Sequence, residues 1–83
     1  MRKVTVLYFA AVRDLVPHDE EVMELPDDVH TVREFAAFLP GRHASLAGRL
    51  ASVRVARNEV FALDDELIGD GDVLALIPPV AGG

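Results

Sequence analysis

The stretch Val73-Leu74-Ala75-Leu76-Ile77 decides the fold, because all of its side chains are apolar and both faces of an extended strand would then be apolar. Such a strand lies in the middle of a sheet, or it has one face on the core and the other against a partner. Gly69-Asp70-Gly71-Asp72 predicts a turn before it. Pro78-Pro79 predict its end, because proline has no backbone N–H to donate to a neighbouring strand.

The N-terminal part of the chain predicts a hairpin. Residues 4–9 are rich in β-branched and aromatic side chains and alternate in character, which favours a strand. If the valines of this strand face the core, Phe9 is left near the surface. A second, shorter strand is predicted at residues 21–25, with Glu21 in solvent, and the loop through Pro17-His18-Asp19 has a length that suits a hairpin.

The middle of the chain predicts one main helix. Thr31-Val32-Arg33-Glu34 has the pattern of a capping box, in which residues 31 and 34 exchange side-chain and backbone hydrogen bonds. Pro40-Gly41 predicts its end. Leu46 and Leu50 are four residues apart, which favours a short helical turn. The apolar face of the main helix consists of positions at helical spacing, which are Val32, Phe35, Ala36 and Leu39.

The C-terminal part predicts two short strands before the final one. Asn58-Glu59 predicts a tight turn between residues 53–57 and 60–63, since Asn tolerates a positive φ. Leu67 and Ile68 are expected to anchor the acidic loop that follows to the core. The whole order predicts an α+β fold of the β-grasp, or ubiquitin-like, type. One main helix packs on a mixed sheet of about five strands, and the last strand runs parallel to the first.

Composition excludes several classes of function. The chain has 83 residues, of which 51% are hydrophobic, so it is expected to form one domain with its own core. Its formal net charge of −6 argues against nucleic acid as a partner. It has no cysteine, which excludes disulfides, thiolate metal sites and a catalytic thiol. No stretch approaches the ~18 apolar residues of a membrane span, so a soluble, cytoplasmic protein is expected.

No constellation of side chains predicts an active site in the chain itself. The acidic residues between 64 and 72 do not follow the spacing of a calcium loop, and no metal site is predicted. The turn at residues 69–72 lacks the lysine and the following helix of a phosphate loop. No role is assigned to the dispersed histidines, which are expected at the surface or at an edge and are His18, His30 and His43.

The reactive group predicted by the sequence is the carboxylate of Gly83. Residues 1–77 are expected to form the domain, and residues 78–83, Pro-Pro-Val-Ala-Gly-Gly, a flexible reactive tail. Its prolines keep the tail extended, and its glycines have no side chain to hinder entry into a narrow channel. A carboxylate with a pKa near ~3.5 is ionised at neutral pH and must be activated, for example as an acyl-adenylate. A sulfur nucleophile that displaced AMP would leave a thiocarboxylate.

Several motifs together resemble the small, sulfur-carrying subunits of molybdopterin synthase, and the resemblance covers essentially the whole chain. The motifs are residues 6–13 (Val-Leu-Tyr-Phe-Ala-Ala-Val-Arg), Thr31-Val32, residues 55–59 (Val-Ala-Arg-Asn-Glu), residues 70–73 (Asp-Gly-Asp-Val) and the ending at 78–83. The ending is the most specific of them. Arg57 departs from the family pattern, which more often has an apolar residue there.

The resemblance implies a defined sequence of reactions. A ubiquitin-activating-like adenylyltransferase would adenylate Gly83 with ATP and magnesium, and a sulfurtransferase would supply the sulfur of a Gly83 thiocarboxylate. The tail would then enter the large subunit of molybdopterin synthase and donate sulfur to cyclic pyranopterin monophosphate. The complex would be a heterotetramer, in which this chain is a sulfur donor with no active site and no bound cofactor of its own.

The resemblance also implies a docking surface. The matching apolar positions are Phe9, Phe61 and Ile77, for which ordinary core packing is the alternative. The tail residues expected to contact the partner are Pro78, Pro79, Val80 and Ala81, while Gly82 and Gly83 carry the chemistry.

Three other functions remain open at this point. The chain could be a sulfur carrier of the thiamin type, with the same activation and a different acceptor. It could be a ubiquitin-like protein modifier, in which Gly83 forms isopeptide bonds with lysines. It could also be a binding module whose tail is unreactive, because a fold does not determine a function.

Overall fold

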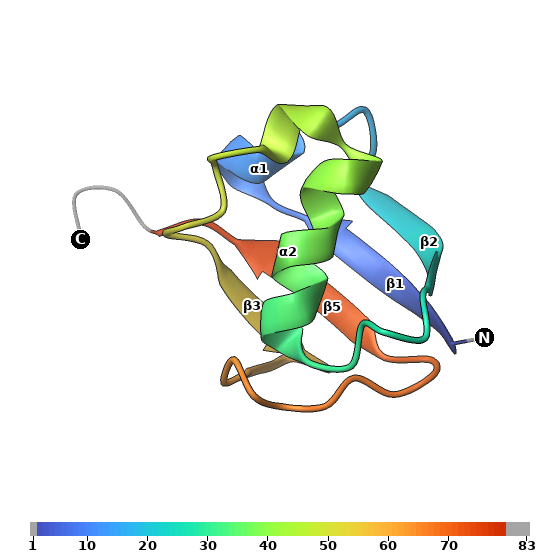
Figure 1. Cartoon of the computed structure of the whole chain (residues 1–83). Coiled ribbons are helices and arrows are strands. Elements are labelled where there is room, and N and C mark those ends of the chain that lie inside the picture. The colour runs from blue at the N-terminus through green and yellow to red at the C-terminus, as the bar shows by residue number, and fades with distance from the viewer. Residues whose placement is uncertain (1, 80–83) are drawn as a thin grey trace.

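The computed structural model describes residues 2–79 and contains one five-stranded sheet with one main helix (Figure 1). The helical segments are α1 (Ala10–Arg13), α2 (Val32–Arg42) and the short 3-10 helix η1 (Ala44–Leu46). The strands are β1 (Arg2–Tyr8), β2 (Glu20–Leu25), β3 (Arg54–Arg57), β4 (Val60–Phe61) and β5 (Val73–Ile77). Their order across the sheet is β2-β1-β5-β3-β4.

Strand β5 occupies the centre of the sheet. It runs parallel to β1, with Thr5 opposite Val73, and antiparallel to β3, with Val55 opposite Leu76. The hairpin of β1 and β2 is antiparallel. The central position of β5, its parallel pairing with the first strand and the β-grasp arrangement are therefore confirmed.

Helix α2 crosses one face of the sheet, and its N-terminus is fixed by the predicted capping box (Figure 1). The Thr31 hydroxyl accepts a hydrogen bond from the Glu34 N–H at 3.2 Å, and the Glu34 carboxylate accepts one from the Thr31 N–H at 3.0 Å. Phe35 and Leu39 are fully buried beneath the helix. The predicted apolar face is thus the face that packs on the sheet.

The prediction that the helix ends at Pro40-Gly41 is wrong, because α2 continues to Arg42. Proline removes the N–H that would bond to the fourth residue before it, and its ring crowds the carbonyl of that residue, but in a last turn only one hydrogen bond is lost and the helix runs on for two residues. The turn is closed by the His43 N–H, which donates to the Leu39 carbonyl at 2.9 Å. The predicted short turn after the helix is present as η1, with Leu46 fully buried.

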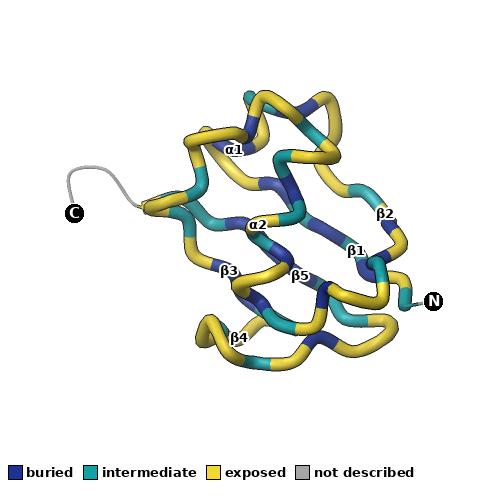
Figure 2. Tube along the Cα trace, viewed as in Figure 1, coloured by how far each residue is buried: buried dark blue, intermediate teal, exposed yellow. Residues whose placement is uncertain are grey.

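The core lies between α2 and the sheet (Figure 2). Alternation along each strand places one set of side chains in this layer, and β5 contributes Leu74 and Leu76. The other large core residues include Val4, Val6, Tyr8, Met23, Leu25, Val32 and Val55. Within residues 2–79, no helix is both long and apolar enough to cross a membrane.

Two predictions about single side chains are wrong. Glu21 lies opposite Val6 on the covered face of the sheet, and only 14% of its side chain is exposed, although it was expected in solvent. Leu67 is exposed while Ile68 is buried, so only one of the two anchors the loop. In both cases the alternation of an extended chain decides the outcome, since neighbouring side chains point to opposite sides.

The tight turn between β3 and β4 is confirmed. Asn58 and Glu59 have φ values of 53° and 74°, as a two-residue hairpin turn requires. The Asn58 side chain also accepts a hydrogen bond from the Val73 N–H at 2.9 Å and donates one to Asp72 at 3.0 Å. The turn is thereby attached to the start of β5.

Candidate functional site

The face of the sheet opposite α2 carries an apolar depression. The register across four strands brings Leu7, Ala75, Ala56 and Phe61 into one row. The two alanines form the floor of the depression, and larger side chains surround it. Its lining consists of Leu7, Phe9, Ala56, Glu59, Phe61, Val73, Ala75 and Ile77, and this set is called the open face below.

The three side chains predicted to dock a partner all lie on the open face. Phe9 is 46% exposed, Phe61 is 53% exposed and Ile77 is half-buried. Phe9 follows β1 directly as the N-cap residue of α1, and Ile77 is the last residue of β5. Core packing, the alternative interpretation, is therefore wrong for the two phenylalanines. Exposed aromatic side chains at an apolar patch are typical of protein interfaces.

The tail begins at the edge of this same face. Pro78 is half-buried and Pro79 is exposed, and both border a small hollow with Phe9, Ala10 and Ile77. The predicted tail residues Val80, Ala81, Gly82 and Gly83 lie outside the described residues. The structure thus brings together the predicted docking side chains and the two prolines that lead into the tail.

Arg54 is a member of this region that the sequence analysis did not identify. Its guanidinium carbon lies 4.5 Å from the centre of the Phe61 ring, which is a cation–π contact. It faces Ile77 across the β3–β5 pairing. The signal that could have found it is alternation, which places residue 54 on the same side of β3 as Ala56 and therefore on the side of the open face.

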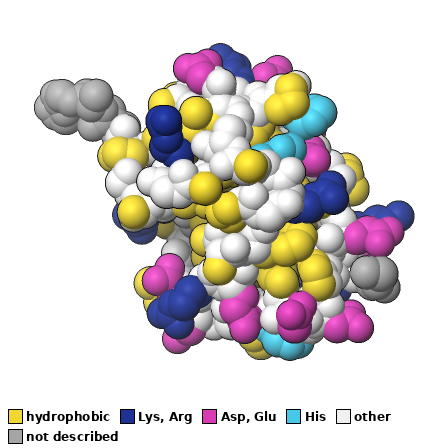
Figure 3. Space-filling view, turned by 45° about the horizontal axis from the view of Figure 1, so that its top comes forward, with side chains coloured by type: hydrophobic (Ala, Val, Ile, Leu, Met, Phe, Trp, Pro, Cys, Tyr) yellow, Lys and Arg dark blue, Asp and Glu magenta, His cyan; other side chains and the backbone are white. Residues whose placement is uncertain are grey.

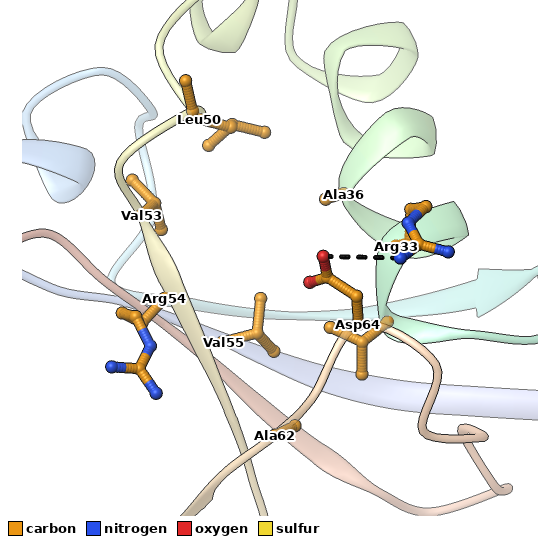
Figure 4. A pocket seen from close by; sticks show the side chains of 10 residues that line it. Arg33, Ala36, Leu50, Val53, Arg54, Val55, Ala62 and Asp64 are labelled. Atoms are coloured by element: carbon orange, nitrogen blue, oxygen red, sulfur yellow. Dashed lines mark ion pairs between the residues drawn. The ribbon is translucent and has the colours of Figure 1, made fainter.

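A second hollow lies on the helix side, between α2 and β3 (Figure 4). Apolar side chains such as Val53 and Val55 form its walls. Arg33 and Asp64 form an ion pair at 3.7 Å at its rim, and both side chains are largely exposed. Surface ion pairs of this kind contribute little to stability.

A partly buried polar cluster lies at the far edge of the covered face. The Tyr8 hydroxyl donates to the Glu21 carboxylate at 2.8 Å, and the His43 ring Nε2 lies 2.6 Å from the same oxygen. Burial raises the pKa of Glu21, but the hydrogen bonds from His43 and Tyr8 outweigh it and hold that pKa below its usual value. Burial and the bond to Glu21 raise the pKa of Tyr8. The cluster joins β1, β2 and the end of α2, which is a structural role.

A further carboxylate supports the start of β5. Burial raises the pKa of Asp72, but hydrogen bonds from the Gly69 N–H, Asn58 and Arg57 more than compensate and lower it.

Figure 3 shows acidic and basic side chains interspersed over the helix side of the molecule. Among residues 2–79, no group of three or more histidine, aspartate or glutamate side chains is arranged to hold a metal ion.

Comparison with known proteins gives the family. The ThiS family profile matches residues 6–83. The molybdopterin synthase sulfur carrier subunit of Mycobacterium tuberculosis is 37% identical over 100% of both chains, and that of Chlamydomonas reinhardtii is 34% identical over 98% of this chain and 99% of its own. The crystal structure of small archaeal modifier protein 1 from Haloferax volcanii is 26% identical, with a TM-score of 0.83 over 96% of this chain and all of the other. The chain therefore belongs to the ThiS family.

Proposed function

We propose that this chain is the sulfur carrier subunit of a molybdopterin synthase. The observation that carries the proposal is the position of the tail, whose first residues leave the sheet at the edge of the open face. A partner that covers Phe9, Phe61 and Ile77 would therefore receive the tail at its own surface. Relatives named as such carrier subunits, which align over the full chain, support the same function.

The chemistry proposed for the tail takes place at Gly83. An adenylyltransferase with ATP and magnesium joins the carboxylate to AMP and releases pyrophosphate. A sulfurtransferase then supplies sulfur as a persulfide, which displaces AMP; reductive cleavage of the S–S bond by a thiol leaves the thiocarboxylate. The chain has no cysteine to hold sulfur elsewhere, so the main-chain terminus is the carrier.

The proposed partner in the final step is the large subunit of the synthase. The open face suits a protein partner because its centre is apolar and aromatic, which is the composition of interface cores. The large subunit would take sulfur from Gly83 and place it on cyclic pyranopterin monophosphate, so that this chain binds no cofactor itself.

The experiment that tests the function is an intact-mass measurement of the full chain after incubation with ATP, an activating enzyme and a sulfur source. We expect a gain equal to the difference between sulfur and oxygen, located at Gly83. The control is a chain that lacks Gly82 and Gly83, which should gain no mass and still bind the large subunit. If the full chain gains no sulfur while the activating enzyme modifies another carrier, the proposal is wrong.

Protein modification is the second candidate, because the chain shares its fold and 26% of its aligned residues with a small archaeal modifier protein. Both functions need the same adenylate, and they differ in the nucleophile that attacks it. Adducts between Gly83 and lysine side chains in cell extracts would support the modifier. Thiocarboxylate without such adducts would support the carrier.

A further inference from the structure

Arg54 is a fixed cation at one corner of the open face. Its guanidinium lies over the exposed ring of Phe61, and Figure 4 shows its side chain directed away from the pocket between α2 and β3. A guanidinium stacked on an aromatic ring loses less conformational freedom on binding than a side chain that moves freely. The charge is therefore held beside two of the side chains that we propose to contact the large subunit, Phe61 and Ile77.

The guanidinium of Arg54 is not neutralised within the described part of the chain. The ion pairs formed by residues 2–79 involve other cations, and none includes Arg54. By contrast, Arg57 on the same strand is paired with both Glu66 and Asp72. Arg54 is thus available for a carboxylate from outside the chain.

The charges around the open face are arranged asymmetrically. Arg54 lies on β3 next to the residue from which the tail departs, and the glutamates on this side of the sheet lie away from it. Glu59 lies in the turn at the other end of β3 and lines the open face. Glu20 and Glu24 lie on β2 at the opposite edge, and alternation places both on the side away from α2, where Lys3 lies opposite Glu24. A partner with an acidic side chain near Arg54 is therefore attracted in one orientation and repelled in the reverse one.

We propose that Arg54 orients the large subunit by pairing with one of its carboxylates at the corner of the open face where the tail begins. This inference rests on the proposed function, and it adds the chemistry that the partner must present: an apolar surface bordered by an aspartate or glutamate. The apolar contacts supply affinity, and the ion pair selects the orientation in which the tail enters the partner. Arginine suits this role better than lysine, since its planar group stacks on Phe61 and presents two N–H groups to a carboxylate at once.

The experiment measures the dissociation constant of the full chain with its large subunit at low and at high salt. Arg54→Gln should weaken binding about fivefold and Arg54→Glu about thirtyfold at low salt, with smaller effects at high salt because exposed charges are screened. Arg54→Lys should fall between the wild type and Arg54→Gln. The matched controls are Arg33→Gln and Arg33→Glu on α2, which make the same charge changes on the opposite face and should leave binding unchanged.

A charge exchange makes the test sharper. Replacing acidic residues of the large subunit by lysine, one at a time, should identify one position that restores the binding of Arg54→Glu and weakens the binding of wild type. Thermal unfolding of each Arg54 variant should match that of wild type, because the residue is exposed.

The outcomes separate this inference from the proposed function. If Phe61→Ala disrupts binding but the Arg54 variants bind like wild type at both salt concentrations, the docking face is real and the role of Arg54 is wrong. The proposed role of Arg54 is also wrong if Arg54→Glu binds the large subunit normally and only its adenylation by the activating enzyme is impaired. If Phe61→Ala also binds the large subunit normally, the docking face itself is wrong, and with it the inference about Arg54.

Discussion

The two faces of β5 use similar side chains for different purposes. Leu74 and Leu76 point to the covered face and are buried under α2, whereas Val73, Ala75 and Ile77 point to the open face. Burial on the covered face stabilises the fold, while the apolar surface of the open face contributes nothing until a partner covers it. An all-apolar strand in a small domain can therefore belong to a core on one face and to an interface on the other. Matched substitutions on the covered face and the open face test this division.

The largest expected effect is on the covered face. Phe35→Ala removes a fully buried ring from the centre of the core, and we expect the free energy of unfolding to fall by about 3–5 kcal/mol. That is a large fraction of the total stability of a domain of this size. Urea unfolding followed by circular dichroism measures it. A loss below about 1 kcal/mol would show that the covered face is not the core.

The matching substitution on the open face should affect binding instead of folding. Phe61→Ala should leave the free energy of unfolding within about 0.5 kcal/mol of wild type, because the ring is already 53% exposed. It should weaken binding to the large subunit by about 2 kcal/mol, the size typical of a central interface residue. Calorimetric titration measures the second value. A variant that unfolds easily and binds normally would contradict the division between the faces.

A smaller effect distinguishes two glutamates of β2. Glu21→Gln keeps an acceptor for Tyr8 and His43 but removes the charge, and should lower the free energy of unfolding by about 1 kcal/mol at pH 7. Glu24→Gln, on the side of β2 that points away from α2, should change it by less than about 0.5 kcal/mol.

The pH dependence of the Glu21 effect follows from its lowered pKa. A carboxylate with a lowered folded-state pKa stabilises the fold above its unfolded pKa of about 4.3, and the contribution is lost as the pH falls through the folded value. The difference between wild type and Glu21→Gln should therefore shrink below about pH 4.3. Thermal unfolding between pH 3 and pH 7 checks this. A difference that grows toward low pH would refute the assignment.

The smallest expected effect lies in the turn beside the open face. Glu59 has a φ of 74°, which costs a residue with a side chain about 1 kcal/mol, so Glu59→Gly should raise the free energy of unfolding by roughly 0.5–1 kcal/mol. Asn58→Gly should do the opposite, because the Asn58 side chain bonds to the Val73 N–H and to Asp72. If both substitutions changed the free energy of unfolding in the same direction, a single cause would control both positions. A rise in both would point to backbone strain, and a fall in both to side-chain hydrogen bonding.

Alternation and capping signals were sufficient to predict most of the fold. The run at 73–77 predicted the central strand, residues 31–34 predicted the start of α2, and Phe9 was predicted outside the core. The errors arose where a residue's type was given more weight than its position. Glu21 was expected in solvent because it is charged, yet its pairing with Val6 places it on the covered face. Pro40 was expected to stop a helix that its single missing N–H could not stop.

The candidate site was predictable in its apolar part and not in its charged part. Phe9 and Ile77 lie at the ends of predicted strands, so their convergence followed from the parallel pairing of the first and last strands. The turn at residues 58–59 sets Ala56 opposite Phe61, but Arg54 lies diagonal to that pair, so its contact with the ring depends on the conformation of a long side chain, which no local pattern specifies. The roles of Val80, Ala81, Gly82 and Gly83 stay predictions.

The central position of β5 has a consequence for biosynthesis. Strand β5 joins the β1–β2 hairpin to the β3–β4 pair, so the sheet cannot be complete before residue 77 has been synthesised. A chain that ends before β5 lacks Ala75 and Ile77, and it cannot assemble the open face from its remaining strands. Fragments of this kind, left by interrupted translation, would not compete with the finished chain for the partner. The fold thus makes recognition conditional on a chain that already extends to the start of its tail.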